Sequence, residues 1–405
     1  MPHSHAIVLL LFIILGVVAG AVSGWVWGEA MLAVAWMGDL FLNALKMLII
    51  PLIIAAVISG VASLGDIRKL GRLGGITVLY FVGTTAIAVA IGLLMVNLLQ
   101  PGVGLAFETK AIPESMAAKT DIGLSDILLS MVAPNLIAAA AETQLLPLIL
   151  FSILLSAALT TLGPVGEHVI GMFDGLNEAL MKLVIWLMYL APLGIFALVA
   201  ARLGQAGGGE AFLSEITAVG LHVATVLSGL ALHFVVLVLL LVFISGRGLG
   251  YLFGLLRALF TAFGTASSSA TLPLTMECAR EQGIDEKAVR FVLPLGSTVN
   301  MNGTALYEAA AAMFIAQAYG IDLGFGAQTV IFITATLAAI GAAGIPEAGL
   351  VTMVIVLTAV GLPIEGIGLL LAVDWFLDRF RTAVNVWGDA VGAAVVHRFL
   401  PNSGS

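Results

Sequence analysis

Long apolar stretches recur from one end of this sequence to the other, and they restrict its fold more than any other feature. Wound as helices, stretches of roughly 20 residues match a hydrocarbon core about 30 Å thick. Hydrophobic residues make up 61% of the 405 residues and charged residues only 10%, far from the usage of soluble domains. The stretches are continuous and do not alternate apolar with polar residues, which favours helices over a barrel. The sequence therefore predicts an all-α membrane protein, embedded in the lipid bilayer, without a soluble domain.

Six continuous apolar segments come first. They are residues 7–27, 40–64, 76–99, 124–162 with an interruption near Glu142, 172–203 and 216–245. Arg68, Lys69 and Arg72 follow the second segment, whereas the loop around Glu29 after the first has no basic residue. The positive-inside rule therefore places the N-terminus in the cytoplasm. The first segment lacks a basic start and a convincing cleavage site, so we predict a retained helix and not a signal peptide.

Two later apolar segments, 251–282 and 327–362, are interrupted by small residues and proline. The first contains GTASSSATLP at 264–273 and the second AIGAAGIPEAG at 339–349. Non-helical backbone at membrane depth needs protein or a water-filled cavity to satisfy its polar groups, so we predict two re-entrant hairpins whose tips meet in one polar cavity. The alternative is a pair of close helix-packing surfaces rich in small residues.

Each interrupted segment precedes a helix with a polar motif, at 289–316 and 367–397. A unit of hairpin and helix that occurs twice indicates an inverted repeat. In such repeats substrate binds at the repeat interface, near the bilayer midplane.

Charge, cysteine and histidine content exclude several other classes of protein. The net charge of −8 gives no reason to expect a nucleic-acid partner. Cys278 is the single cysteine, so no internal disulfide is expected. His222 and His233 lie in one apolar segment without zinc-ligand spacing, and we interpret them as packed or pore-lining neutral residues.

The last helix has a continuous polar face. At 100° per residue, Asp374, Asp378, Arg381, Asn385 and Asp389 fall within about 80° of one another. An ionisable group at the bilayer centre costs about 2.5–3.5 kcal/mol, so four of them on one face need partners, ions or water. Mutual ion pairing is the purely structural alternative, but one arginine cannot neutralise three carboxylates. The excess negative charge therefore predicts cation binding.

The chemistry of this face predicts an acidic amino acid as ligand. The guanidinium of Arg381 suits a bidentate grip on a carboxylate, and Asp378, one turn away, suits an ammonium group. Asn385 adds a donor for the second carboxylate. The first hairpin tip, with Ser267, Ser268 and Ser269, offers unpaired N–H groups at a helix N-terminus.

The preceding helix contains NMNGTALYE at 300–308, which predicts an unwound turn in mid-membrane. Carbonyl groups freed there can ligate a hard cation, with Asp389 supplying charge. Glu308 follows one turn beyond Thr304, and a carboxyl buried without a partner is expected to be protonated. The alternative role of Glu308 is a protonated hydrogen-bonding residue of the core.

Together these residues resemble the glutamate transporter family, the dicarboxylate/amino acid:cation symporters that include the animal excitatory amino acid transporters. The likeness covers nearly the whole chain, and the segments that carry it are 46–52, 267–273, 300–308, 341–349 and 374–389.

The resemblance implies eight transmembrane helices, two re-entrant hairpins, a homotrimer and an elevator motion of a transport domain against a scaffold. Scaffold helices 1 and 2 would lie in 1–70, and helices 4 and 5 in 120–210. The transport domain would take helix 3 from 71–105. Its remaining parts, helix 6, hairpin 1, helix 7, hairpin 2 and helix 8, would come from 211–400.

The resemblance also implies residue roles. Arg381 would bind the side-chain carboxylate, Asp378 the ammonium group, and Asn385 with the first hairpin tip the α-carboxylate. Other implied substrate residues are Thr304 and Thr382, with Ile345 and Gly349 of the second hairpin as the gate. One sodium would be held by Asp389 with carbonyl groups of Gly296, Asn300 and Asn385. A second would be held by carbonyl groups of Thr298, Ala339, Ile340 and Ala342, beside Met301.

One departure concerns a third sodium site. Asn302 stands where the family usually has aspartate, and Phe81 where it often has tyrosine; the other ligands would be Thr84 and Thr85. A neutral amide replaces an anion at a site that must strip sodium of water. We therefore predict that the third sodium is absent or much weakened.

The resemblance also raises the transport of two further cations, the proton and potassium. Glu308 lies where animal members have a glutamate linked to proton transport, which makes proton co-transport a candidate. Arg379 is adjacent to Asp378 as in those members, which leaves potassium counter-transport open.

The function predicted is a sodium-coupled secondary symporter of glutamate or aspartate in the cell (inner) membrane, with both termini cytoplasmic. A substrate-gated anion channel of the same fold is the alternative. An intramembrane serine hydrolase at Ser267–Ser269 is disfavoured, because no histidine lies near that tip in sequence and His222 and His233 have no evident orienting acid. The protein is thus not expected to be an enzyme.

Overall fold

A computed structural model of the chain describes residues 3–62, 71–105, 129, 131–142, 144–205, 209–341 and 348–400. Within these residues the protein is all-helical, which confirms the predicted class. The α-helices are α1 (His3–Trp27), α2 (Ala35–Ala62), α3 (Gly71–Leu99), α6 (Leu136–Ala141), α7 (Leu145–Leu159), α8 (Pro164–Met188), α9 (Ala191–Gln205), α10 (Gly209–Leu240), α11 (Gly250–Thr265), α12 (Ser268–Glu281), α13 (Glu286–Val299), α14 (Asn302–Ala318), α15 (Phe325–Ala338), α16 (Ala348–Ala359) and α17 (Ile367–Phe399). Short 3₁₀ turns are η1 (Gly28–Val34), η3 (Ala339–Gly341) and η4 (Ile364–Gly366), and η2 (Leu241–Ser245) is π-helical.

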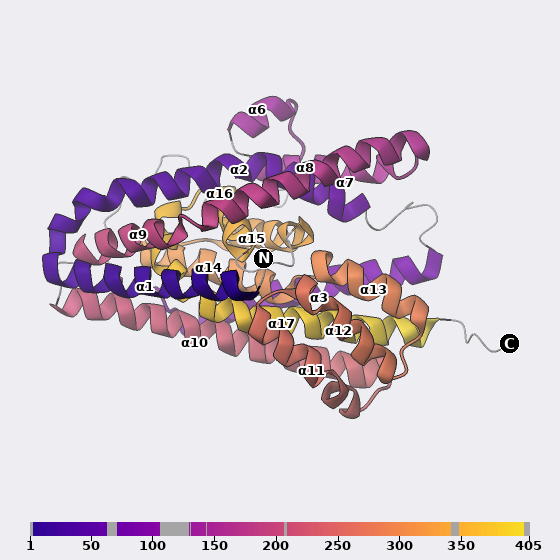
Figure 1. Cartoon of the computed structure of the whole chain (residues 1–405). Coiled ribbons are helices and arrows are strands. Elements are labelled where there is room, and N and C mark those ends of the chain that lie inside the picture. Colours follow the sequence, from indigo (N-terminus) through magenta and orange to yellow (C-terminus); the bar gives the residue numbers. More distant parts are fainter. Residues whose placement is uncertain are drawn as a thin grey trace.

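The helices form an elongated bundle (Figure 1), which buries charged residues of α17 in an apolar core and exposes many large apolar side chains. At the centre, α14 buries 16 of its 17 residues, and it packs against α3, α10 and α17. At the periphery, Trp25, Trp27 and Trp36 of the α1–α2 hairpin are more than half exposed. Because lipid solvates apolar side chains and not charged ones, this arrangement is typical of a membrane protein.

By length and apolar composition, three stretches of the described helices are sufficient to cross a bilayer. They are Leu15–Ala44, Leu73–Leu99 and Thr217–Ser245. The first of these includes the turn η1 between α1 and α2. The predicted number of eight spans therefore stays a prediction.

Most expected helices are present, but the segment 172–203 is not one helix. It is divided between α8 and α9, which are separated by Tyr189 and Leu190. Pro192 in the first turn of α9 lacks an N–H and restricts the residue before it, so a helix readily restarts there but does not continue through it. The expected interruption near Glu142 is confirmed, because α6 ends at Ala141 and α7 begins at Leu145.

The helix breaks predicted at the first hairpin tip and in the 300–308 motif are present, whereas residues 342–347 of the second predicted tip lie outside the described residues. Between α11 and α12, Ala266 has a left-handed backbone (φ 49°), and Ser267 caps α12 by accepting a hydrogen bond from the N–H of Ala270 (3.2 Å). Asn300 and Met301 separate α13 from α14. α11 packs on α12 and α15 on α16, as in helical hairpins. The depth of these hairpins in a membrane stays a prediction.

Candidate functional site

The polar face predicted for the last helix is present on α17 and lies inside the protein. Asp374, Asp378, Arg381, Asn385 and Asp389 each expose 6% or less of their surface. Charged side chains are rarely buried unless a partner or an ion compensates them. The contacts of each residue therefore indicate what the site is built to hold.

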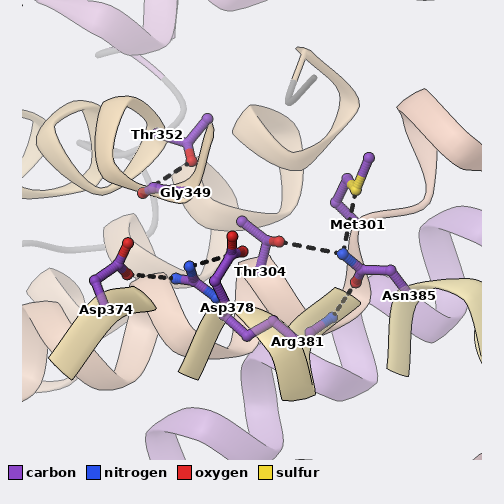
Figure 2. Close-up of polar contacts among 9 residues, drawn as sticks. Met301, Thr304, Gly349, Thr352, Asp374, Asp378, Arg381 and Asn385 are labelled. Carbon is purple, nitrogen blue, oxygen red and sulfur yellow. Dashed lines mark hydrogen bonds and ion pairs between the residues drawn. The ribbon is translucent and has the colours of Figure 1, made fainter. Parts of the chain in front are cut away.

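Arg381 lies between two carboxylates of its own helix (Figure 2). Its Nη2 donates a hydrogen bond to Oδ1 of Asp378, and its Nη1 lies 3.0 Å from Oδ1 of Asp374. The contact with Asp374 lacks hydrogen-bond geometry, and Nε and Nη1 find no acceptor among the described residues. Mutual ion pairing thus leaves donors of the guanidinium unused, and a further carboxylate can accept from them.

Two neighbouring helices hold the guanidinium in place. The ring of Tyr307 on α14 lies under it, with 4.1 Å between the guanidinium carbon and the ring centroid. On α16, a Cβ added at Gly349 would lie 2.8 Å from Nη1 of Arg381, so any larger residue there would displace the guanidinium. Thr352 donates a hydrogen bond to the carbonyl oxygen of Gly349 (3.2 Å). The start of α16 thus meets α17 at Arg381, and the gate role of Gly349 stays a prediction.

Asn385 connects α17 to the unwound start of α14. Its Oδ1 accepts a hydrogen bond from the N–H of Gly303 (2.7 Å), and its Nδ2 donates to Sδ of Met301 (3.2 Å) and to the hydroxyl of Thr304 (3.3 Å). Of these residues, Thr304 and Asn385 were predicted from the sequence to bind substrate and Met301 to lie beside a sodium site, whereas no role was predicted for Gly303. However, both donors of Asn385 face protein groups here, so a bond to a substrate carboxylate requires one of them to be exchanged.

The first hairpin tip is joined to α17 by a residue for which the sequence gave no structural role. Arg379 donates from Nη1 to the carbonyl oxygens of Phe263 (3.1 Å) and Gly264 (2.8 Å) at the end of α11. Of the predicted tip residues, Ser267 and Ser268 are buried and Ser269 is exposed. Cations near a helix C-terminus stabilise its unpaired carbonyl groups, so Arg379 holds the tip against α17.

A second polar layer surrounds Asp389. Its Oδ1 accepts a hydrogen bond from Nδ2 of Asn300 (2.9 Å), and Oδ1 of Asn300 accepts from the hydroxyl of Thr84 on α3 (3.3 Å). The carboxylate lies so close to α13 that a Cβ added at Gly296 would be 2.4 Å from it. The predicted cation ligands Asp389, Asn300 and Gly296 are therefore neighbours.

Asn302 completes this layer without adding charge. Its Oδ1 accepts a hydrogen bond from the hydroxyl of Thr85 (2.7 Å), and its Nδ2 is buried without an acceptor among the residues described. Phe81 is buried beside Gly296, and its phenyl ring has no oxygen to offer an ion. Thr84, Thr85, Asn300 and Asn302 are all neutral, so the layer contains one carboxylate.

Glu308 is fully buried on the α16 side of α14. Neither carboxyl oxygen makes a hydrogen bond of standard geometry within the described chain, and the side chain that interacts with it is that of Thr352. Thr352 also contacts Gly349, which lies against Arg381. Glu308 is thus connected to Arg381 through Thr352 and Gly349, and it also lies close enough to the guanidinium to interact with its charge.

For the remaining predicted residues, the structure gives few contacts with the rest of the site. Thr382 is buried on α17, and Thr298 donates a hydrogen bond to the carbonyl oxygen of Leu295 (3.1 Å). Ala339 and Ile340 form η3, where the carbonyl oxygen of Ile340 lies against Gly60 of α2. The predicted ligand Ala342 and the predicted gate residue Ile345 lie outside the described residues.

A buried arginine with unused donors, and a separate buried carboxylate, at the centre of an all-helical membrane protein are suited to bind charged solutes, as in membrane transporters. The chain is a member of the sodium:dicarboxylate symporter family, whose model matches residues 9–399, and this membership makes it a transporter and not an enzyme.

Curated relatives are similar over almost the whole chain. An excitatory amino acid transporter of Caenorhabditis elegans is 37% identical over 96% of this chain and 87% of the relative. Human excitatory amino acid transporter 3 is 40% identical over 90% of this chain and 79% of its own length. Human excitatory amino acid transporter 2 is 36% identical over 96% and 78%.

Proposed function

We propose that this protein is a sodium-coupled secondary active symporter of acidic amino acids, L-glutamate or L-aspartate. The observation that carries the proposal is the buried guanidinium of Arg381, which keeps unused donors although two carboxylates lie beside it. The names of the relatives, excitatory amino acid transporters, support the same substrate class.

The substrate fits the charges of the site. Its side-chain carboxylate accepts from Arg381, its ammonium group pairs with Asp378, and its α-carboxylate takes donors from Asn385 and the first hairpin tip. Thr304 lies within hydrogen-bond distance of Asn385, in keeping with a supporting role. The second hairpin closes over the substrate through Gly349, which already contacts the guanidinium.

Two sodium ions enter with the substrate in this proposal. The first is held at Asp389 by the carboxylate and by carbonyl groups of Gly296, Asn300 and Asn385. Sodium prefers such oxygen ligands, as other hard cations do. The second is held by carbonyl groups of Thr298, Ala339 and Ile340 beside Met301, at the base of the second hairpin.

The first prediction concerns the number of sodium ions. Because Asn302 and Phe81 add no anionic ligand beside Thr84 and Thr85, and the layer has the carboxylate of Asp389 alone among the residues described, uptake should be coupled to fewer than three sodium ions per substrate. The reversal potential of the uptake current, measured at several sodium gradients, gives this number. The double variant Asn302→Asp with Phe81→Tyr should raise it. Three-ion coupling in the unmodified protein would refute the prediction.

The loss of one sodium has a large effect on the gradient that uptake can sustain. Moving one net charge across about 100 mV changes the free energy by ~2.3 kcal/mol, close to a fiftyfold concentration ratio. A co-transported proton would restore most of this driving force. In our proposal Glu308 carries that proton, and potassium counter-transport is left to the same electrical measurements.

The second prediction concerns that proton. Glu308→Gln keeps the shape of the side chain and removes its titration, so uptake should lose its dependence on the proton gradient while substrate binding is retained. Proteoliposomes with an imposed pH difference and no sodium difference measure this dependence. The variant Glu365→Gln, in the turn before α17, is the matched control. Equal proton coupling in the wild type and in Glu308→Gln would exclude the role.

For the whole protein, we propose a homotrimer in the cell membrane with both termini cytoplasmic. Helix 3 and residues 211–400 would move as an elevator against a scaffold of helices 1, 2, 4 and 5. The dense packing of α17 on α10, α11, α13 and α14 supports one moving unit. The contacts of this unit with the scaffold, made by η3, η4 and α16 on α2 and by α17 on α9, are the surfaces that would slide.

Uptake of radiolabelled L-glutamate into proteoliposomes under an inward sodium gradient tests the function. A symporter accumulates substrate above the external concentration, and collapse of the sodium gradient releases it. The alternative, a substrate-gated anion channel, gives anion currents without accumulation.

A further inference from the structure

Two histidines on α10 have no part in the site described so far. The side chains of His222 and His233 are fully buried, and no described residue forms a hydrogen bond with either ring nitrogen of either one. A buried polar group without a partner is uncommon and costs free energy, so each invites a functional explanation. The two residues differ in what they contact.

His222 lies behind the arginine of the substrate site. Its ring centroid is 4.6 Å from that of Phe314 and 6.2 Å from that of Tyr307, both on α14. The Tyr307 ring in turn lies 4.1 Å from the guanidinium carbon of Arg381. His222, Tyr307 and Arg381 thus form a column from α10 through α14 to α17, and Phe314 packs on His222 beside it. The aromatic contact next to His233 is made by Phe234 and involves Trp387, away from this column.

We propose that His222 is a positioning residue for Arg381: it fixes the ring of Tyr307, and the ring fixes the guanidinium. The inference rests on the proposed function, because it takes Arg381 as the group that binds the substrate carboxylate. Attraction between a guanidinium and a ring depends on the guanidinium staying over the ring face. A tilt of Tyr307 therefore turns the donors of Arg381 away from the substrate, to which they must be aligned closely.

His222 performs this role as an uncharged ring. It faces Tyr307 and Phe314 on α14, and the charged groups beyond Tyr307 are Arg381, Asp374 and Asp378. A protonated imidazole would add a second positive charge one ring away from Arg381, in surroundings that screen charge poorly. Aromatic shape, and not titration, is the property that the site uses.

Four single variants test the inference by the KM and maximal rate of sodium-driven L-glutamate uptake. His222→Ala and His222→Leu remove the ring, and each should raise KM about fivefold or more with a maximal rate within about twofold. His222→Phe should restore KM to within about twofold of the wild type, because it keeps the ring. His233→Ala, an equally buried histidine of the same helix, should leave KM unchanged. The sodium concentration for half-maximal uptake should be the same in all four.

The possible results separate the inference from the proposed function. Equal KM values in the His222 and His233 variants, or a fall in maximal rate alone, would overturn the positioning role and leave the transport function standing. A parallel loss of sodium affinity in His222→Leu would show general damage to the fold and would also overturn it. A wild type that accumulates neither L-glutamate nor L-aspartate would overturn the proposed function and this inference with it.

Discussion

Replacement of Arg381 by cysteine should abolish uptake of L-glutamate and L-aspartate and admit neutral amino acids. The guanidinium of Arg381 has N–H donors that are free to bind a substrate carboxylate. A cysteine thiol at this position would have no positive charge and would be a weak hydrogen-bond donor. Loss of one partner of a buried charge pair costs about 3–5 kcal/mol, which corresponds to at least about a hundredfold loss of affinity. Competition of unlabelled glutamate, alanine and serine against labelled substrates measures the change in selectivity.

Arg379→Cys is the matched control for this experiment. Arg379 is a neighbouring arginine of the same helix, but its hydrogen bonds go to the carbonyl oxygens of Phe263 and Gly264. Its loss should loosen the first hairpin tip and slow uptake without a change from acidic to neutral substrates. Undiminished glutamate uptake by Arg381→Cys would refute the assignment of the substrate carboxylate to Arg381.

The two carboxylates beside Arg381 explain how its charge can be buried. Asp374 and Asp378 place two negative charges next to one positive charge, so the guanidinium is not an isolated buried cation. An incoming carboxylate can then take over donors that Asp374 holds only by an ion pair. Exchange of partners costs less than creation of a new pair from bare charges.

The sequence was sufficient to predict the polar face of α17, because helical periodicity places every fourth or third residue on one side. It was also sufficient for the break at Asn300 and Met301 and for the tip at Ser267. In each case local chemistry, an asparagine with glycine or a run of serines, determines the backbone. The family followed from the same motifs.

Contacts between segments that are distant along the chain could not be predicted from the sequence. That the ring of Tyr307 lies under Arg381, and that Arg379 reaches the end of α11, depends on how separate helices pack. The position of Tyr307 in the motif 300–308 indicates that it lies near the site. It does not indicate which residue the ring contacts, because an aromatic side chain in an apolar helix can pack in many ways. The sequence does contain a signal for the division of 172–203, because Pro192 lacks an N–H and favours the start of a new helix. The continuous hydrophobic run around Pro192 conceals this signal.

Replacement of Asp389 by asparagine is the second change with a large expected effect, and it should act on sodium and not on substrate choice. Asp389 supplies the single carboxylate of a buried layer whose other members, Asn300, Asn302 and Thr84, are neutral. At 4 Å and an effective dielectric constant of about 20, one unit charge attracts another by ~4 kcal/mol. The sodium concentration for half-maximal uptake should therefore rise at least about tenfold, with acidic substrates still preferred.

Asp322→Asn, an exposed carboxylate in the loop before α15, is the control for loss of negative charge elsewhere. An unchanged sodium requirement in Asp389→Asn would contradict the first sodium site. The comparison with Asn302→Asp then tests the whole layer, because one variant removes the charge that the layer has and the other adds a charge that it lacks. If cation binding follows the number of carboxylates, sodium affinity should fall in the first variant, and a sodium ion should be gained in the second when Phe81→Tyr supplies the missing oxygen. The neutral amide at 302 would then be the reason that this protein couples uptake to fewer sodium ions.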